Sequence, residues 1–433
     1  MKMKFKALAL AAAAAFASIA PARAQSPEEQ GYTLKQVFVL SRHNIRTPLN
    51  SYRALMDSLT THKGQWTEWS AHSSELTLHG GVAETIMGQY FNEWLTGVGF
   101  IPRNWVPGED EVLFYSNCFQ RTVATARYFA SGMLPQADIV VNHKNELDLL
   151  FVPVMDTATP EFIAQVNRER AAMGGPAGMR GMEDSLARYY RVLEKVLDYE
   201  HSDYCAAHGG IHFASDTIRV VDRVGKEPAM RCLLRKAIAP SDALVLQYYE
   251  EKDLRKAAFG HDLSFEEWCA LARIKDIYED LMVSPPTMAV NTHHTMLQFI
   301  KGEFSRKGRK FSFLCGHDST IASVLAAIGA EHYVLPGAIE GRTPLGGKLV
   351  IERYSRGGVD YARLSMVYAS SEQLRNTEQL RVSNPPMRYV LKLKGVESEG
   401  GFCRWEDFES RLDYSIAAYD GTPKGIAVTF ENK

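Results

Sequence analysis

Residues 37–48 read VFVLSRHNIRTP, a short apolar run that passes directly into a polar loop rich in cations. Two further stretches have the same form, VLFYSNCFQR at 112–121 and FSFLCGHDST at 311–320. A continuous apolar run of this length is typical of a strand that is covered on both faces, as in a parallel α/β sheet. Ligands of such sheets bind beyond the carboxyl ends of the strands, so we expect the three polar loops to meet at one edge.

Amphipathic helical patterns follow these strands, at 82–95, 122–133 and 320–328, and a fourth strand candidate covers 348–354. Between about 141 and 305 helical patterns dominate, for example at 186–199 and 265–282. The sequence therefore predicts an α/β fold whose core is formed by both ends of the chain, 25–140 and 306–433. Helices should cover both faces of its sheet, and a mainly α-helical cap domain, 141–305, should be inserted between its strands.

The N-terminus has the pattern of a cleaved secretory signal. Lys2, Lys4 and Lys6 precede an apolar run at 7–20, and residues 22–24 read ARA. The run is shorter than the roughly 18 to 20 residues that span a bilayer, so we expect residues 1–24 to be removed and no membrane anchor to remain. The whole chain of 433 residues has a formal charge of −2, and loss of its four N-terminal cations makes it more acidic. This charge argues against nucleic-acid binding.

The three loops contain side chains that suit a phosphate group. Guanidinium groups match phosphate oxygens, and an imidazole can act as nucleophile. Taken singly, an arginine–histidine loop is usually a solvated basic turn, and an aspartate at a helix start is usually a cap. Their joint placement after three buried strands favours a phosphate site instead. The candidate residues are Arg42, His43, Arg46, Arg121, His317 and Asp318.

These motifs resemble those of a known family. RHNIRTP at 42–48 resembles the RHGxRxP signature of histidine acid phosphatases, and GHD at 316–318 resembles their downstream HD motif. Asn44 stands where Gly is usual, and this departure is similar to the glucose-1-phosphatase subgroup of exported bacterial enzymes. The resemblance covers roughly 34–413 and is strongest at QRTVATA (120–126), LQYYE (246–250), RTPLGGK (342–348) and EQLRN (372–376).

The resemblance implies a phosphoglycerate-mutase-like core, a periplasmic location and cleavage of phosphomonoesters in two steps without a metal or other cofactor. His43 would attack phosphorus, and Asp318 would protonate the leaving group and then activate water. The phosphoryl oxygens would be held by Arg42, Arg46, Arg121 and His317. The resemblance also implies that Glu227, in a Glu-Pro pair of the cap, lies over the site and contacts substrate. The alternative for Glu227 is a surface acid on a loop.

Several alternatives stay open at this stage. The expected partner is a small sugar phosphate or inositol phosphate, so a phytase of the same family competes with a phosphatase acting on glucose 1-phosphate. A non-catalytic phosphate-ester-binding protein is a third possibility, but it would not need His43 together with Asp318. Four residues of types that can bind a metal ion lie near one another in the sequence, but their spacing is loose and we expect no metal. They are His201, Cys205, His208 and His212. Pairing of the six cysteines and the oligomeric state are not predicted.

Overall fold

The computed structural model describes residues 26–430. The predicted signal sequence, 1–24, lies outside these residues. Among the helices of residues 26–430, none is both long and apolar enough to cross a bilayer.

One mixed eight-stranded sheet forms the core, with the strand order β10-β8-β7-β1-β6-β2-β3 and β9 paired to β8. Its parallel half consists of β1 (Thr33–Arg42), β6 (Phe311–Gly316), β2 (Val112–Ser116) and β3 (Asn142–His143). Its antiparallel half consists of β7 (Lys348–Arg356), β8 (Val359–Tyr368), β9 (Met387–Val390) and β10 (Cys403–Arg404). The predicted α/β class is confirmed, and β1 lies at the junction of the two halves.

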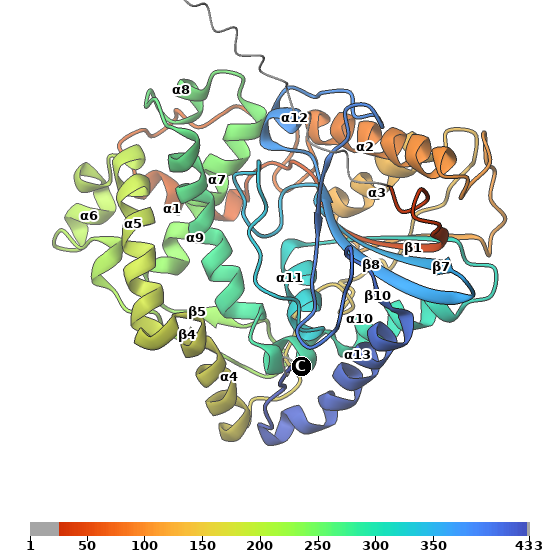
Figure 1. Ribbon diagram of the computed structural model, residues 1–433. Helices are drawn as coiled ribbons and strands as arrows, with labels where there is room; N and C mark the ends of the chain where they lie inside the picture. The colour runs from red at the N-terminus through yellow and green to blue at the C-terminus, as the bar shows by residue number, and fades with distance from the viewer. Residues whose placement is uncertain (1–25, 431–433) are drawn as a thin grey trace, which may run out of the picture.

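Helices cover both faces of this sheet, as Figure 1 shows. Successive side chains of β1 point to opposite faces. Phe38 and Leu40 pack in an apolar cluster with α10 (Pro286–Ser305), α11 (Asp318–Ala327) and α13 (Trp405–Ala418). Val37 and Val39 pack in a second cluster with α2 (Leu78–Gly97) and α3 (Gln120–Met133). The continuous apolar run in the sequence is therefore explained by a strand buried on both sides.

Most of the remaining helices form a separate layer beside the sheet, drawn on the left of Figure 1. They are α4 (Pro160–Met173), α5 (Met179–Leu197), α6 (Asp203–Ala207), α7 (Leu233–Glu250), α8 (Leu254–Ala257) and α9 (Phe265–Val283). A short hairpin, β4 (Val220–Val221) and β5 (Ala229–Met230), accompanies them. Short 3-10 segments lie at Asn50–Tyr52, Gly175–Ala177, Tyr199–His201, Phe213–Ser215 and Tyr419–Lys424.

The apolar clusters show how the chain is shared between the sheet and the helical layer. Met56 of α1 (Arg53–Ser58), Trp66 and Leu374 of α12 (Ser371–Arg375) pack with the helical layer. Helix α10 instead packs with the sheet. The cap boundaries at 141 and 305 stay a prediction, and this packing favours an end of the cap before α10.

Candidate active site

The three predicted loops lie side by side because the parallel strands end in register. Arg42 of β1 pairs with Gly316 of β6, and Ser116 of β2 pairs with Cys315. Beyond these pairs, the His43 amide donates to the Gly316 carbonyl at 3.1 Å. A cavity of about 430 Å³ opens at this edge of the sheet. It is lined by six of the seven predicted site residues: His43, Arg46, Arg121, Glu227, His317 and Asp318.

His43 is a neutral imidazole with one nitrogen free to react. Its Nδ1 lies 2.9 Å from the Asn44 carbonyl, an acceptor, so the proton is on Nδ1 and Nε2 carries the lone pair. Burial lowers the pKa of His43 well below its ordinary value, and the positive charges of Arg121 and Arg42 lower it further. The side chain therefore stays unprotonated at acidic pH, where an exposed histidine would be charged.

The arginines surround this imidazole with charge that is only partly compensated. Nη2 of Arg42 lies 3.1 Å from Oδ2 of Asp318, and Nη2 of Arg46 lies 2.8 Å from Oδ2 of Asp242. Within residues 26–430, Arg121 donates only to the neutral hydroxyl of Ser74, at 2.6 Å. Burial and the charge of Arg46 lower the pKa of Arg121 to about 10, so it remains a cation. An anion in the cavity would reduce the repulsion between the guanidinium groups of Arg42, Arg46 and Arg121, and a phosphate group can accept hydrogen bonds from all of them.

Asn117 orients His317 and was not singled out from the sequence. Its side-chain amide nitrogen lies 3.0 Å from Nε2 of His317, so it donates there and leaves the His317 proton on Nδ1. Burial and the charge of Arg121 lower the pKa of His317 to about 3. The only signal for Asn117 was its position directly after β2, in the same polar loop as Arg121.

Asp318 begins α11 and is held by two cations. Nζ of Lys275, on α9, lies 2.7 Å from Oδ2 of Asp318 and 3.0 Å from Oδ1 of Asp242, on α7. Burial alone would raise the pKa of Asp318, but Lys275 and Arg42 hold it well below its usual range. These two cations therefore keep Asp318 a carboxylate. A bound phosphate dianion competes for the same cations, so its arrival raises the pKa of Asp318 and favours protonation.

Besides Asp242, the helical layer contributes two further acids to the cavity. Glu227 lies in the loop of the β4–β5 hairpin, and Glu279 lies on α9, one turn after Lys275. Burial raises the pKa of both carboxyl groups, and the charge of Asp318 raises them further. Sequence analysis missed Glu279 because it belongs to an ordinary amphipathic helix without a motif.

Asn44, the departure from the family signature, does not line the cavity. It is buried, and its side-chain amide donates to Oε1 of Glu84 at 2.8 Å. Lys348 also binds Glu84, at 3.0 Å. Gly346 packs so closely on Asn44, with φ +66°, that a Cβ there would lie 2.4 Å from the amide nitrogen. Asn44 and the RTPLGGK stretch, which seemed separate markers in the sequence, thus form one buried cluster behind the His43 loop.

The histidines of the alternative metal cluster have separate partners. Nδ1 of His201 lies 2.7 Å from Oδ1 of Asp198, and Nδ1 of His212 lies 3.3 Å from Oε2 of Glu194. Across residues 26–430, no group of three or more His, Cys, Asp or Glu side chains is arranged to hold a metal ion.

The cavity thus combines several cations, a neutral imidazole and a carboxyl group beside it. These are the requirements of an enzyme that transfers a phosphoryl group through a histidine.

Comparison with known proteins agrees with this class. The profile of the histidine phosphatase superfamily (branch 2) matches residues 33–171. The chain is 34% identical over 404 residues to the glucose-1-phosphatase of Providencia rettgeri, which covers 91% of this chain and 94% of the relative. It is also 34% identical to the glucose-1-phosphatase of Salmonella typhimurium, over 90% of this chain and 94% of that protein.

Among solved structures, the apo form of Hafnia alvei phytase is 25% identical and covers 89% of this chain and 97% of that one, with a TM-score of 0.80. The chain therefore belongs to the histidine phosphatase superfamily, branch 2. The prediction of a histidine acid phosphatase similar to glucose-1-phosphatases is confirmed.

Proposed function

We propose that this phosphatase acts on glucose 1-phosphate and similar sugar phosphates in the periplasm, after removal of residues 1–24. The names of the two curated relatives support the substrate. The N-terminal signal pattern supports the location. The observation that carries the proposal is the neutral His43 among arginines at the floor of the cavity.

In the first step, Nε2 of His43 attacks phosphorus and the bond from phosphorus to the ester oxygen breaks. The charges of Arg42, Arg46 and Arg121 neutralise the three remaining phosphoryl oxygens, and neutral His317 helps to hold them by hydrogen bonding. Protonated Asp318 gives its proton to the leaving sugar oxygen, which departs as an alcohol.

In the second step, Asp318 is a carboxylate and removes a proton from water as the water attacks phosphorus. The bond from phosphorus to Nε2 breaks, which releases inorganic phosphate and restores His43. Lys275 and Arg42 stabilise this carboxylate, since they lie 2.7 and 3.1 Å from its Oδ2. Glu227 accepts hydrogen bonds from sugar hydroxyls above the phosphate.

A substrate panel tests the proposal. The purified protein should hydrolyse glucose 1-phosphate with a higher kcat/KM than phytate at acidic pH, and chelators should leave the rate unchanged. A preference for phytate would overturn the substrate assignment. Loss of activity with EDTA and recovery with zinc would overturn the metal-free mechanism.

A further inference from the structure

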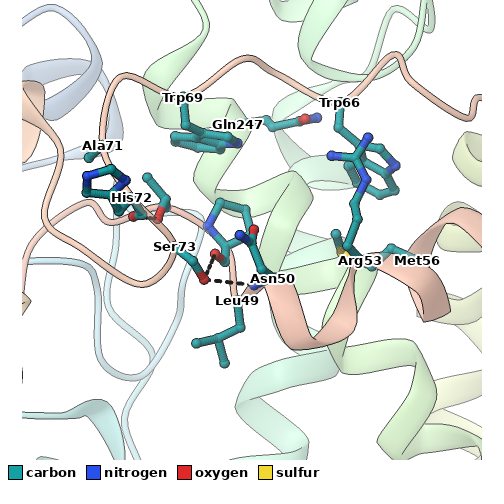
Figure 2. Close-up of a pocket in the computed structure, with 12 residues that line it drawn as sticks. Leu49, Asn50, Arg53, Met56, Trp66, Trp69, Ala71, His72, Ser73 and Gln247 are labelled. Atoms are coloured by element: carbon teal, nitrogen blue, oxygen red, sulfur yellow. Dashed lines mark hydrogen bonds between the residues drawn. The ribbon is translucent and has the colours of Figure 1, made fainter.

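A second cavity, of about 290 Å³, lies next to the proposed phosphate site. Leu49 lines both cavities, and the loop from Thr47 to Asn50 that follows Arg46 forms one wall of the second. Leu49 lies three positions after Arg46 in the chain, so their backbones are at most ~11 Å apart. A ligand with its phosphate at His43 therefore has the second cavity within reach. Figure 2 shows Trp66, Trp69 and His72 around this cavity.

Hydrogen bonds to neighbouring elements fix the walls. Nε1 of Trp66 donates to Asp57 at 3.1 Å. The amide of Thr67 donates to the side chain of Gln247, on α7, at 2.7 Å. The amide of Asn50 donates to the hydroxyl of Ser73 at 2.8 Å. The cavity is therefore preformed, as small-molecule sites usually are.

The same wall is joined to the phosphate site. Ser74 directly follows Ser73 and accepts the hydrogen bond from Arg121. Its φ is +69°, an unusual conformation for a residue other than glycine. Such backbone conformations are concentrated at ligand sites.

Three polar groups of the cavity have no hydrogen-bond partner within residues 26–430. They are Nε1 of the half-buried Trp69 and the exposed side chains of Asn50 and His72. An indole N–H usually finds an acceptor when it is partly buried. An apolar ring face beside free donors and acceptors is suited to a ligand that has both a flat apolar face and hydroxyl groups.

Charge narrows the class of ligand. Among the residues that the structure describes, no acidic side chain lines the cavity, which disfavours a cation. Its one arginine, Arg53, already binds Asp57 at 3.0 Å, which disfavours an anion. A neutral polyhydroxylated ring remains. The C–H face of a pyranose packs on an indole, while its hydroxyl groups exchange hydrogen bonds with amide and imidazole groups.

We propose that this cavity is a subsite for a second pyranose ring, so that the substrates include phosphorylated disaccharides. Their phosphate is held at His43 and their outer sugar packs on Trp69. The inference rests on the proposed function, because it extends the sugar phosphate beyond its first ring.

Kinetics with glucose 1-phosphate and maltose 1-phosphate test the subsite. The wild type should favour maltose 1-phosphate. Trp69→Leu should lower the ratio of kcat/KM for maltose 1-phosphate over that for glucose 1-phosphate by about tenfold, a loss equivalent to ~1.4 kcal/mol. Trp94→Leu is the matched control, because Trp94 is a half-buried tryptophan on α2 that packs on Arg388 instead. It should leave the ratio unchanged.

A second variant keeps the test valid if Trp69→Leu does not fold. The double change Asn50→Ala and His72→Ala alters only exposed side chains and should lower the same ratio by about threefold. The subsite is overturned if both variants keep the wild-type ratio of kcat/KM for maltose 1-phosphate over that for glucose 1-phosphate. It is also overturned if the protein hydrolyses glucose 1-phosphate but not maltose 1-phosphate. Either result leaves the proposed function unchanged.

Saturation-transfer NMR with maltose separates binding from turnover. The wild type should transfer magnetisation to maltose, and Trp69→Leu should abolish the transfer. If the wild type binds maltose and Trp69→Leu does not, but the wild type hydrolyses neither glucose 1-phosphate nor maltose 1-phosphate, the subsite is supported and the proposed function is overturned. No transfer to maltose in the wild type would overturn the subsite.

Discussion

The arginines around His43 have two effects that depend on one another. They attract the phosphate group, and the same positive charges lower the pKa of the imidazole that must attack it. A nucleophilic histidine at acidic pH needs this arrangement, because an exposed imidazole with a pKa near 6.5 would be protonated and unreactive.

Replacement of His43 by alanine should reduce turnover of every phosphate ester by ~10³-fold or more, since the nucleophile is removed. The thermal unfolding midpoint should not fall, because a buried imidazole among cations contributes little to stability. Wild type quenched in alkali should carry an acid-labile, base-stable phosphate that the variant lacks. Near-normal turnover by the variant would show that another group attacks phosphorus.

Asp318→Asn should harm alkyl phosphates more than aryl phosphates. A sugar alkoxide needs a proton as it leaves, whereas an aryl oxide leaves readily without one. We expect a loss of ~10²- to 10⁴-fold on glucose 1-phosphate and a clearly smaller loss on p-nitrophenyl phosphate, measured as kcat at one pH. Equal losses would indicate that Asp318 has only a structural role at the start of α11.

Residues at strand ends could be predicted from the sequence, and their neighbours on helices could not. Arg42, His43, His317 and Asp318 lie directly after apolar runs, so the local pattern shows both the strand and the loop. Lys275, Asp242 and Glu279 reach the cavity from the middle of long helices. In the sequence they look like the polar positions of any amphipathic helix, and only the packing of α7 and α9 brings them to Asp318.

At the scale of elements, the strand that carries the site is anchored by a buried ion pair. Lys348, the first residue of β7, lies at 3.0 Å from Glu84 on α2 and at the same distance from the hydroxyl of Ser41 on β1. Both charged side chains are fully buried. The pair connects the antiparallel half of the sheet to the layer formed by α2 and to the start of the His43 loop.

Lys348→Met should lower the free energy of unfolding by about 3–5 kcal/mol, because Glu84 is left as an uncompensated buried charge. Urea denaturation would measure the change. Lys63→Met is the matched control, since Lys63 and Asp203 form an exposed ion pair and its loss should cost less than ~1 kcal/mol. Similar values for the two variants would contradict a structural role for the buried pair.

The elements themselves were predicted unevenly. The predicted strand at 112–115 and the helices at 122–133 and 265–282 correspond closely to β2, α3 and α9. Strands β8, β9 and β10 were not predicted, because β8 mixes polar and apolar residues and the other two are very short. Pairing with β7 sets the position of β8, and pairing with β8 sets the positions of β9 and β10. No local pattern in the sequence shows these pairings.

At the scale of the whole molecule, the cavity is formed by both layers. The sheet layer supplies His43, Arg46 and Arg121, and the helical layer supplies Lys275 and the acids Glu227, Asp242 and Glu279. On the proposed function, the phosphate chemistry depends on residues that the strands align, and we expect selectivity among esters to depend on the acids of the helical layer.

The pH dependence of substrate choice tests this division. Burial and the charge of Asp318 raise the pKa of Glu227, so Glu227 becomes protonated at a higher pH than an ordinary glutamate as the pH falls. Only the carboxylate repels a polyanion such as phytate. The preference of the wild type for glucose 1-phosphate over phytate should therefore be largest above this raised pKa and should narrow as the pH falls through it.

Glu227→Gln removes the charge at every pH and keeps the size of the side chain. It should reduce the preference by about tenfold at the upper end of the pH range and by little at the lower end, where the wild-type side chain is already neutral. Phytate itself titrates in this range, and this affects the wild type and the variant equally. We therefore take the preference, kcat/KM for glucose 1-phosphate over kcat/KM for phytate, and divide its value in the wild type by its value in Glu227→Gln at each pH. Glu200→Gln, a change at an exposed acid of the helical layer that does not line the cavity, should behave as the wild type. If the wild type and Glu227→Gln show the same ratio at every pH, Glu227 does not select the substrate, and the preference must come from the shape of the cavity alone.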